Sequence, residues 1–400
     1  MTRHLLILLD KSLFQILFFL TVLLSKLRRG TRPQHRLQLS GSESFLVIRP
    51  GGLGDGIMAI PFLKVLRKRC PESKIILLCV QKNKAALSHL RTFDQLIVID
   101  SFSDVYGNIC KLFRNRLDVV FDLEPFRKIS SIISFFTGAK IRIGFDTNSR
   151  RLLYTHPVSY SNEKCFESLN MVRQLEVFDI HVPQDEALDM SFPLPDEVSE
   201  KATETLQVHG LQPEDDFIIA VVPGVLKDHH RWIMPKFSAL ITFIRQGDPT
   251  TRVILLGAPR DFQDANEVIQ HIRHQNGIVN LVGKTDFMEA LGILKACKIL
   301  VASDGGIVYM AAAMGCSTIS LWGPGVMERF KPPGDNHIGV RKDYFCVPCI
   351  NYSRLGEFPD CPYDRKCMTD ISENEVYQEY RHLKARLVSK QDRLASRQVN

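Results

Sequence analysis

Cysteine is too sparse in this sequence to build a disulfide scaffold, because only ten residues are spread over 400 positions. Six of them lie in or beside apolar runs, as reduced core residues of a cytoplasmic protein do: Cys70, Cys79, Cys110, Cys165, Cys297 and Cys316. The sequence also gives no sign of a basic face on a folded domain. Residues 1–44 carry seven Lys or Arg against two acidic residues, a net +5 of the chain's +7. We therefore expect no nucleic-acid partner, and an anionic membrane surface near the N-terminal segment.

The N-terminal segment lacks the uninterrupted apolar core and the cleavage site of a secretory signal. Its apolar run from Leu5 to Leu24 is broken by the charged pair Asp10 and Lys11, and basic residues follow it. We predict a membrane-associated helix within residues 1–43 that lies in the membrane interface. A full span and a leader without a membrane role are the alternatives. Either membrane arrangement leaves the rest of the chain on the cytoplasmic side.

Short apolar runs alternate with helical stretches along the rest of the chain, which is typical of parallel, doubly wound sheets. Strands are expected at 45–49, 75–80, 96–99, 119–123 and 141–144, and again at 217–222, 253–257, 278–282, 299–302 and 318–322. The fold class is therefore α/β, with two Rossmann-like domains facing each other across a cleft. The first domain is expected over residues 44–207 and the second over 208–345, with a cysteine-rich loop and a helix over 346–400. Ligands of such sheets bind beyond the carboxyl ends of the strands.

The loop after the first expected strand, Gly51-Gly52-Leu53-Gly54-Asp55, combines glycines with a carboxylate. It is not a dinucleotide fingerprint, because position 57 holds isoleucine where the third glycine would stand. Gly52 and Gly54 let the backbone approach a ligand closely. Asp55 stands at the start of a helix expected over 56–69, where it can be a cap or a catalyst.

This loop carries a family resemblance. Residues 48–55, followed by Ile60-Pro61 and Leu66-Arg67, resemble the opening of the heptosyltransferases, glycosyltransferase family 9. The resemblance covers residues 45–375 and implies the two-domain architecture called GT-B. It implies that Asp55 is the general base of an inverting transfer, taking the proton of the acceptor hydroxyl, and that the glycine loop lies on the acceptor side.

Three later segments resemble the donor half of that family. The first holds Lys227, His230 and Arg231, which would counter the charge of a leaving diphosphate; a solvated basic loop is the alternative. In the second, Asp261 would accept the ribose hydroxyls, unless it caps the helix that begins near Phe262. In the third, Asp304 is followed by a helix start at which Gly305 and Gly306 would offer backbone amides to a diphosphate. A purely structural turn is the alternative there.

The sequence departs from the family pattern at three positions. Where the family has a lysine, this chain has His230. Where the family has a hydroxyl residue after the aspartate, it has Gly305, and where the family has a histidine a few residues later, it has Tyr309. The donor is therefore less well defined than the fold and the reaction class. In the first domain, Arg142 is expected to meet an anionic acceptor together with Arg150 and Arg151, although runs of charge are usually solvated faces.

Four cysteines near the C-terminus, Cys346, Cys349, Cys361 and Cys367, have a spacing that can close a structural zinc site. Disulfides and free thiols are the alternatives, and none of these states is catalytic. Catalysis itself is expected to need no cofactor.

The resemblance implies an inverting, metal-independent glycosyltransferase at the cytoplasmic face of the inner membrane. Its donor would be a nucleotide sugar, by analogy ADP-heptose, and its acceptor a lipopolysaccharide core or a related glycolipid. An epimerase or hydrolase of nucleotide sugars on the same scaffold is one alternative, because fold does not fix function. A membrane-tethered family member without catalytic activity is another.

Overall fold

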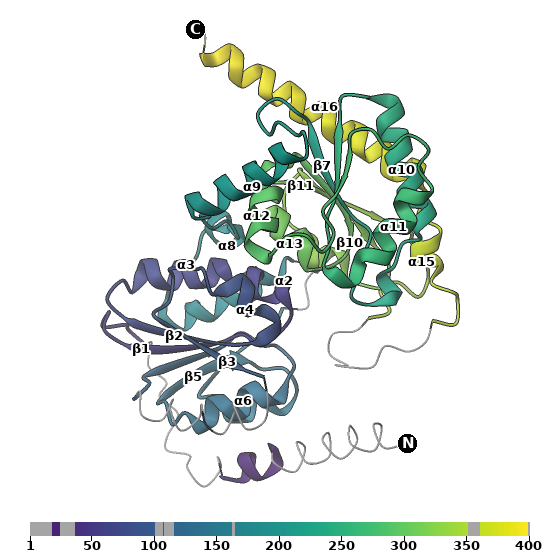
Figure 1. Cartoon of the computed structure of the whole chain (residues 1–400). Coiled ribbons are helices and arrows are strands. Elements are labelled where there is room, and N and C mark those ends of the chain that lie inside the picture. The colour runs from purple at the N-terminus through teal and green to yellow at the C-terminus, as the bar shows by residue number, and fades with distance from the viewer. Residues whose placement is uncertain are drawn as a thin grey trace. The chain divides into compact units, whose positions relative to one another are not determined.

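The computed structural model describes residues 18–24, 37–100, 107, 116–161, 165–350 and 361–398; for 391–398 only the backbone is described. The chain forms two compact units, the first ending at Met190 and the second beginning at Ser191. Each unit is built on one parallel sheet with helices on its faces (Figure 1).

The sheet of the first unit has six parallel strands in the order β3-β2-β1-β4-β5-β6. This is the strand order of a doubly wound fold, in which the chain starts in the middle and winds outward in both directions. The strands are β1 (Ser44–Ile48), β2 (Lys74–Val80), β3 (Gln95–Ile99), β4 (Val119–Asp122), β5 (Ile141–Phe145) and β6 (His156–Val158). The helices are α2 (Leu53–Met58), α3 (Ile60–Arg69), α4 (Gln81–Leu87), α6 (Lys128–Phe136), α7 (Glu167–Val172) and α8 (Gln184–Leu188), with the 3-10 helices η1 (Asn148–Leu153) and η2 (Arg173–Phe178).

The sheet of the second unit repeats this design in the order β12-β11-β10-β7-β8-β9, again with all strands parallel. Its strands are β7 (Ile218–Val222), β8 (Arg252–Leu255), β9 (Ile278–Asn280), β10 (Ile299–Ser303), β11 (Ser317–Trp322) and β12 (His337–Arg341). Its helices are α9 (Asp196–Val208), α10 (Met234–Gly247), α11 (Phe262–Gln270), α12 (Phe287–Ala296), α13 (Gly306–Ala313), α14 (Met327–Phe330), α15 (Lys366–Thr369) and α16 (Glu373–Gln398), with the 3-10 helices η3 (Asp228–His230) and η4 (Pro259–Asp261).

The prediction of two doubly wound α/β domains is confirmed, and all ten predicted strands are present. Two of the four edge strands, β6 and β12, were not predicted, because they are short or half-buried and carry no continuous apolar run. The helix expected over 56–69 is two helices, because the chain turns at Ala59 between α2 and α3.

Strand β1 shows why both faces of the first sheet need helices. Its residues are buried alternately toward the two faces: Leu46 and Ile48 join a cluster that includes Ile133 of α6. On the other face, the Phe45 ring stacks on Phe121 at 6.0 Å. A strand that is apolar on both sides is stable only between two layers of helix, as in parallel sheets generally.

The C-terminal helix α16 completes the core of the second unit. Its Val376, Tyr380 and Leu383 are buried in the same cluster as the strands β7, β8, β10 and β11. Just before it, the carbonyl of Ile371 accepts a hydrogen bond from Trp232 Nε1 at 2.9 Å. This helix is therefore part of the fold and not an appendage.

Of the apolar run from Leu5 to Leu24, the structure describes only residues 18–24, which form a short helix that we call the N-terminal helix. Within the residues that the structure describes, no helix is both long and apolar enough to cross a bilayer. The rest of the predicted membrane-associated segment and its charged pair lie outside the described residues.

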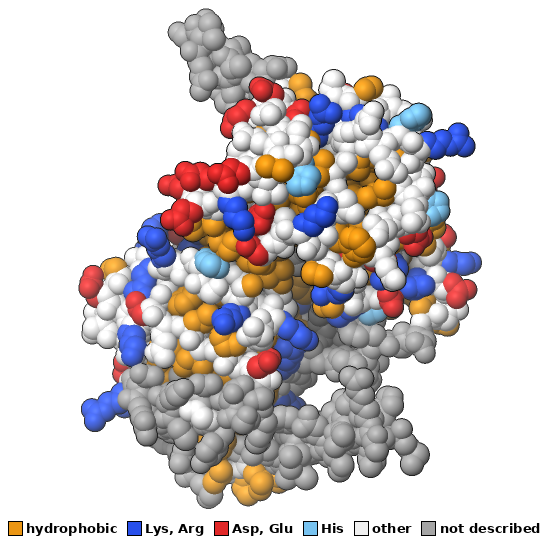
Figure 2. Space-filling model, in the orientation of Figure 1, with side chains coloured by type: hydrophobic (Ala, Val, Ile, Leu, Met, Phe, Trp, Pro, Cys, Tyr) orange, Lys and Arg blue, Asp and Glu red, His pale blue; other side chains and the backbone are white. Residues whose placement is uncertain are grey.

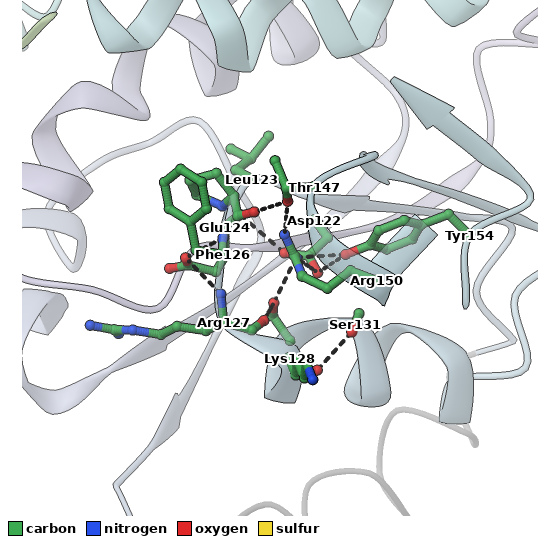
Figure 3. A network of polar contacts seen from close by, with 12 residues as sticks. Asp122, Leu123, Glu124, Phe126, Arg127, Lys128, Ser131, Thr147, Arg150 and Tyr154 are labelled. Atoms are coloured by element: carbon green, nitrogen blue, oxygen red, sulfur yellow. Dashed lines mark hydrogen bonds and ion pairs between the residues drawn. The ribbon is translucent and has the colours of Figure 1, made fainter. Parts of the chain in front are cut away.

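A buried polar network lies at the carboxyl end of β4 (Figure 3). The Arg150 Nη2 atom lies 2.7 Å from Asp122 Oδ2, and both side chains are fully buried. The Tyr154 hydroxyl donates to the same carboxylate oxygen at 2.6 Å, and Ser130 Oγ accepts from Arg150 at 3.0 Å. Burial alone lowers the pKa of Arg150, but Tyr154 and Asp122 outweigh burial and raise it. The expectation that Arg150 meets an acceptor is therefore wrong, because its guanidinium is enclosed and already paired.

We expect Arg150→Met to lower the free energy of unfolding by about 3–5 kcal/mol, because it leaves the Asp122 carboxylate buried without its cation. Chemical denaturation followed by circular dichroism measures this loss. Arg151→Met is the matched control: it removes the neighbouring, exposed guanidinium and should change stability by no more than about 0.5 kcal/mol. Equal losses in both variants would contradict a structural role specific to the buried pair.

Candidate functional site

In the first unit, Asp55 is held by the strand and loop that precede it. Its Oδ2 accepts from the Gly52 amide at 2.6 Å, and its Oδ1 lies 2.9 Å from Arg49 Nη2. The loop passes so close that a Cβ at Gly51 would lie 2.6 Å from the Asp55 side chain. The carboxylate therefore caps α2 and also stays 38% exposed, so the capping role does not remove it from solvent.

Arg49 ties this loop to the neighbouring strand. Its guanidinium donates to the carbonyl of Asp55 through Nε at 3.0 Å and to the carbonyl of Leu123 through Nη1 at 2.9 Å. Asn83, at the start of α4, donates to the Arg49 carbonyl at 2.8 Å. Arg49 is 2% exposed, so these contacts are shielded from water. The ends of β1, β2 and β4 thus fix one carboxylate at one edge of the sheet.

The other acceptor-side candidates of this unit are engaged in local structure. Arg142 Nε donates to the Leu153 carbonyl at 3.1 Å and its Nη1 to the Ala139 carbonyl at 2.6 Å. Gly54 is buried inside α2, whereas the amide of Gly52 serves Asp55. Contact of these residues with an acceptor stays a prediction.

In the second unit, Asp304 follows β10 and precedes the helix α13. Its carboxylate is 10% exposed, and His230 Nδ1 lies 3.4 Å from its Oδ2. Burial raises the pKa of Asp304 to about 7 and lowers the pKa of His230 to about 3. At neutral pH His230 is therefore uncharged, and burial favours the protonated form of Asp304. Among the described residues, no hydrogen bond is made by the buried His230 Nδ1, or by the buried Oγ of Ser303, the residue before Asp304.

Gly305 and Gly306 bring the amino end of α13 to the same place. The first amides of a helix have no intrahelical partner and carry partial positive charge, so this end attracts anions. Lys227 is exposed, and its charge acts on both Asp304 and His230. The structure therefore gathers Lys227, His230 and the Asp304-Gly305-Gly306 turn around one helix end.

Arg231 and Asp261 are both engaged in contacts with neighbouring residues of the second unit. Arg231 pairs with Asp264 at 2.6 Å and with Asp228 at 3.1 Å, which outweighs burial and raises its pKa. Asp261 is 6% exposed, and its Oδ2 accepts from the Ala258 amide at 2.8 Å. A Cβ at Gly224 would lie 2.2 Å from its carboxyl carbon. The Asp261 side chain thus closes the 3-10 helix η4 and makes no capping hydrogen bond to α11, the helix that begins at Phe262. A ribose contact stays a prediction.

Three of the four C-terminal cysteines, Cys346, Cys349 and Cys361, lie on loops, and Cys367 lies in the short helix α15. The rings of Phe345 and Tyr363 pack edge to face at 5.2 Å between the loops. The pKa of Cys367 is raised to about 11, first by burial and then by the other three thiols: Cys346, Cys349 and Cys361. No three His, Cys, Asp or Glu side chains among the described residues are arranged to hold a metal ion. The zinc site therefore stays a prediction.

Sequence reasoning did not single out Arg49, Asn83 or Ser303 as functional. Arg49 directly follows the apolar strand β1, and Ser303 is the last residue of the apolar strand β10. Because ligands of such sheets bind at the carboxyl ends of the strands, this position could have marked both residues as candidates. Nothing in the sequence near Asn83 marks it, because its contact with Arg49 crosses from α4 to β1.

Comparison with known proteins gives a consistent picture. The model of glycosyltransferase family 9 (heptosyltransferase) matches residues 109–357. The lipooligosaccharide heptosyltransferase 2 of Haemophilus ducreyi is 22% identical over 301 residues, which cover 72% of this chain and 85% of that protein.

Two solved structures share the fold. The family 9 glycosyltransferase of Veillonella parvula aligns with a TM-score of 0.71 at 19% identity, over 87% of this chain and 98% of that one. The ADP-heptose lipopolysaccharide heptosyltransferase II of Escherichia coli aligns with a TM-score of 0.66 at 20% identity, over 85% and 98%.

The buried pair in the second unit predicts a pH-dependent stability. Because the native pKa of Asp304 is raised from 3.8 to about 7, the folded state keeps a proton that the unfolded state releases. Stability from this group is therefore lost as pH rises from about 4 to about 7, and is constant above. The lowered pKa of His230 acts in the opposite sense below its ordinary value of 6.5.

We expect Asp304→Asn to remove this loss. Relative to the unchanged protein, the variant should gain on the order of 2–4 kcal/mol of unfolding free energy between pH 4 and 7 and nothing further above. The two proteins share His230, so its titration largely cancels in the difference. Denaturation curves at several pH values measure it, and a difference that does not vary with pH would contradict a raised pKa.

Proposed function

This chain belongs to glycosyltransferase family 9, and we propose that it transfers a heptose from ADP-heptose to a hydroxyl of a lipopolysaccharide core or a related glycolipid. The observation that carries the proposal is that each unit presents reactive or charged groups at the carboxyl ends of its strands. One presents a fixed, exposed carboxylate, and the other presents a helix amino end with a lysine beside it. The Haemophilus relative and the Escherichia structure, which are named as heptosyltransferases, support the choice of sugar.

The proposed reaction is a single displacement with inversion. Asp55 accepts the proton of the acceptor hydroxyl while that oxygen forms a bond to the anomeric carbon of the donor. The bond from the anomeric carbon to the diphosphate oxygen breaks, and ADP leaves with the electron pair. Asp55 suits this role because Arg49 and the Gly52 amide fix its orientation without burying it.

The proposed donor site meets the charge that grows on the leaving diphosphate. The amides at the start of α13 and the ammonium of Lys227 supply positive charge, so we propose that no metal ion is needed. A buried carboxylate at this position would repel a diphosphate if it were ionised. Burial raises the pKa of Asp304, which favours its neutral form and so reduces that repulsion.

The proposed acceptor is anchored in lipid, so the enzyme would act at the cytoplasmic face of the inner membrane. The net charge of +5 within residues 1–44 supports this, because anionic lipids attract basic segments. Arg142 remains the proposed acceptor contact, reached through the part of its half-buried side chain that faces solvent.

The donor can be identified by protection against thermal unfolding with a panel of nucleotide sugars. ADP and ADP-heptose should raise the melting temperature. Lys227→Met should weaken their binding roughly 10–100-fold, because it removes a charge-assisted contact to phosphate. Lys295→Met, which changes an exposed lysine on α12, should have no effect. Protection by UDP or GDP sugars with indifference to ADP forms would overturn the heptose assignment.

The base is tested by Asp55→Asn. We expect acceptor-dependent release of ADP to fall about 10²–10⁴-fold, because the variant cannot take the proton, while ADP still protects against unfolding. Asp94→Asn is the matched control, since Asp94 is also paired with an arginine, Arg67, at 2.7 Å. An unchanged rate in Asp55→Asn would favour a protein without this catalysis. Release of nucleotide without acceptor would favour a hydrolase or epimerase.

Arg49 is proposed as a positioning residue for that base. Arg49→Met should lower kcat roughly 10–100-fold with little change in the KM for the donor, because Asp55 loses its fixed orientation. Arg49→Lys, which keeps the charge, should restore part of the rate. Arg67→Met removes the comparable partner of Asp94 and should leave the rate unchanged. A change confined to KM would contradict the positioning role.

A further inference from the structure

The N-terminal helix, residues 18–24, packs on the first unit by one of its faces. Phe18 and Val22 are buried against Ile132 and Phe135 of α6 and Leu153 of η1. The Lys128 ammonium lies 4.8 Å from the centre of the Phe18 ring. Positions 18, 21 and 22 are the buried ones, which is the spacing of one face of an α-helix. The helix therefore has a fixed orientation on the unit.

The opposite face of this helix is apolar and exposed. Phe19 is 69% exposed, and Leu20, Leu23 and Leu24 are 46–50% exposed. The helix is thus apolar on both sides, although only one side is covered by the unit. Figure 2 shows hydrophobic side chains at the surface at the lower edge of the first unit, where the N-terminal helix lies in Figure 1. A group of large apolar side chains at a protein surface marks a site of association.

The charged residues around the exposed face of the N-terminal helix indicate which kind of partner it binds. Arg127 and Lys128 stand at the start of α6, the helix on which the N-terminal helix packs, and Arg127 and Arg151 are exposed. Aromatic and aliphatic side chains bordered by basic residues are what an anionic lipid surface binds: the apolar groups enter the acyl boundary and the cations meet the headgroups. A helix of seven described residues held by Phe18 and Val22 can lie on such a surface.

We propose that Phe19, Leu20, Leu23 and Leu24 insert into the interface of an anionic bilayer and that α6 holds the N-terminal helix in this orientation. The first unit, which carries Asp55, would then be docked on the membrane directly. This inference deepens the membrane location that is part of the proposed function. It rests on the exposed face and its charges, so it can fail while the sugar transfer holds.

Co-sedimentation of the full chain with vesicles tests the proposal. We expect binding to vesicles of phosphatidylcholine mixed with phosphatidylglycerol, and weaker binding to phosphatidylcholine alone or at high salt. Changing all four residues to serine (Phe19→Ser, Leu20→Ser, Leu23→Ser, Leu24→Ser) should lower the affinity about tenfold or more. The melting temperature should not fall, because these side chains are exposed.

The double variant Val208→Ser, Leu226→Ser is the matched control. It removes two apolar side chains of the second unit that are 83% and 72% exposed, and it should bind vesicles like the unchanged protein. Equal vesicle binding by the fourfold variant would overturn the proposal. So would a concentration-dependent dimer that the fourfold change dissolves, since the face would then bind a second copy. Loss of vesicle binding with sugar transfer retained in detergent would support the docking role alone.

Discussion

The guanidinium of Arg49 is the point on which the candidate chemistry of the first unit depends. It is almost fully buried, yet its donors reach two backbone carbonyls and one carboxylate. A buried cation is stable only when its hydrogen-bonding capacity is used, so the loop cannot move away without leaving a charge unpaired. The same contacts join the end of β1 to the end of β4. The sheet therefore fixes the position of Asp55, although the loop that carries it is rich in glycine.

In the second unit, the candidate carboxyl group has a different environment. Its candidate site has a carboxyl group, Asp304, at a helix end suited to anions. An ionised carboxylate there would repel the anion that the helix end attracts. Burial beside an uncharged His230 shifts the balance toward the neutral acid. Asp55, with an exposed carboxylate paired to a cation, has the opposite environment. Two aspartates that both follow strands thus lie in opposite surroundings, one buried and one paired at the surface.

The sequence was sufficient for the interior of both sheets, because each buried strand is a continuous apolar run between helical stretches. It failed at β6 and β12, where an edge strand needs only one neighbour and can be half polar. Arg150 shows a second limit: a charged residue beside a loop predicts exposure, and only the fold reveals Asp122 and Tyr154 around it. Asp261 shows a third, since a cap and a ribose contact use the same residue type at the same position.

The burial of α16 in the second unit also affects the order in which the protein can fold during synthesis. Every strand of the first sheet lies before residue 160, so that sheet can pair while the later half of the chain is still being made. The second unit cannot, because Trp232 finds its partner only at Ile371, and the core still lacks Tyr380 and Leu383. Until those residues leave the ribosome, the apolar side of the second sheet lacks the cover of α16, although α10 and α11 can already pack on it. Chaperone dependence during synthesis should therefore concentrate in this half of the molecule.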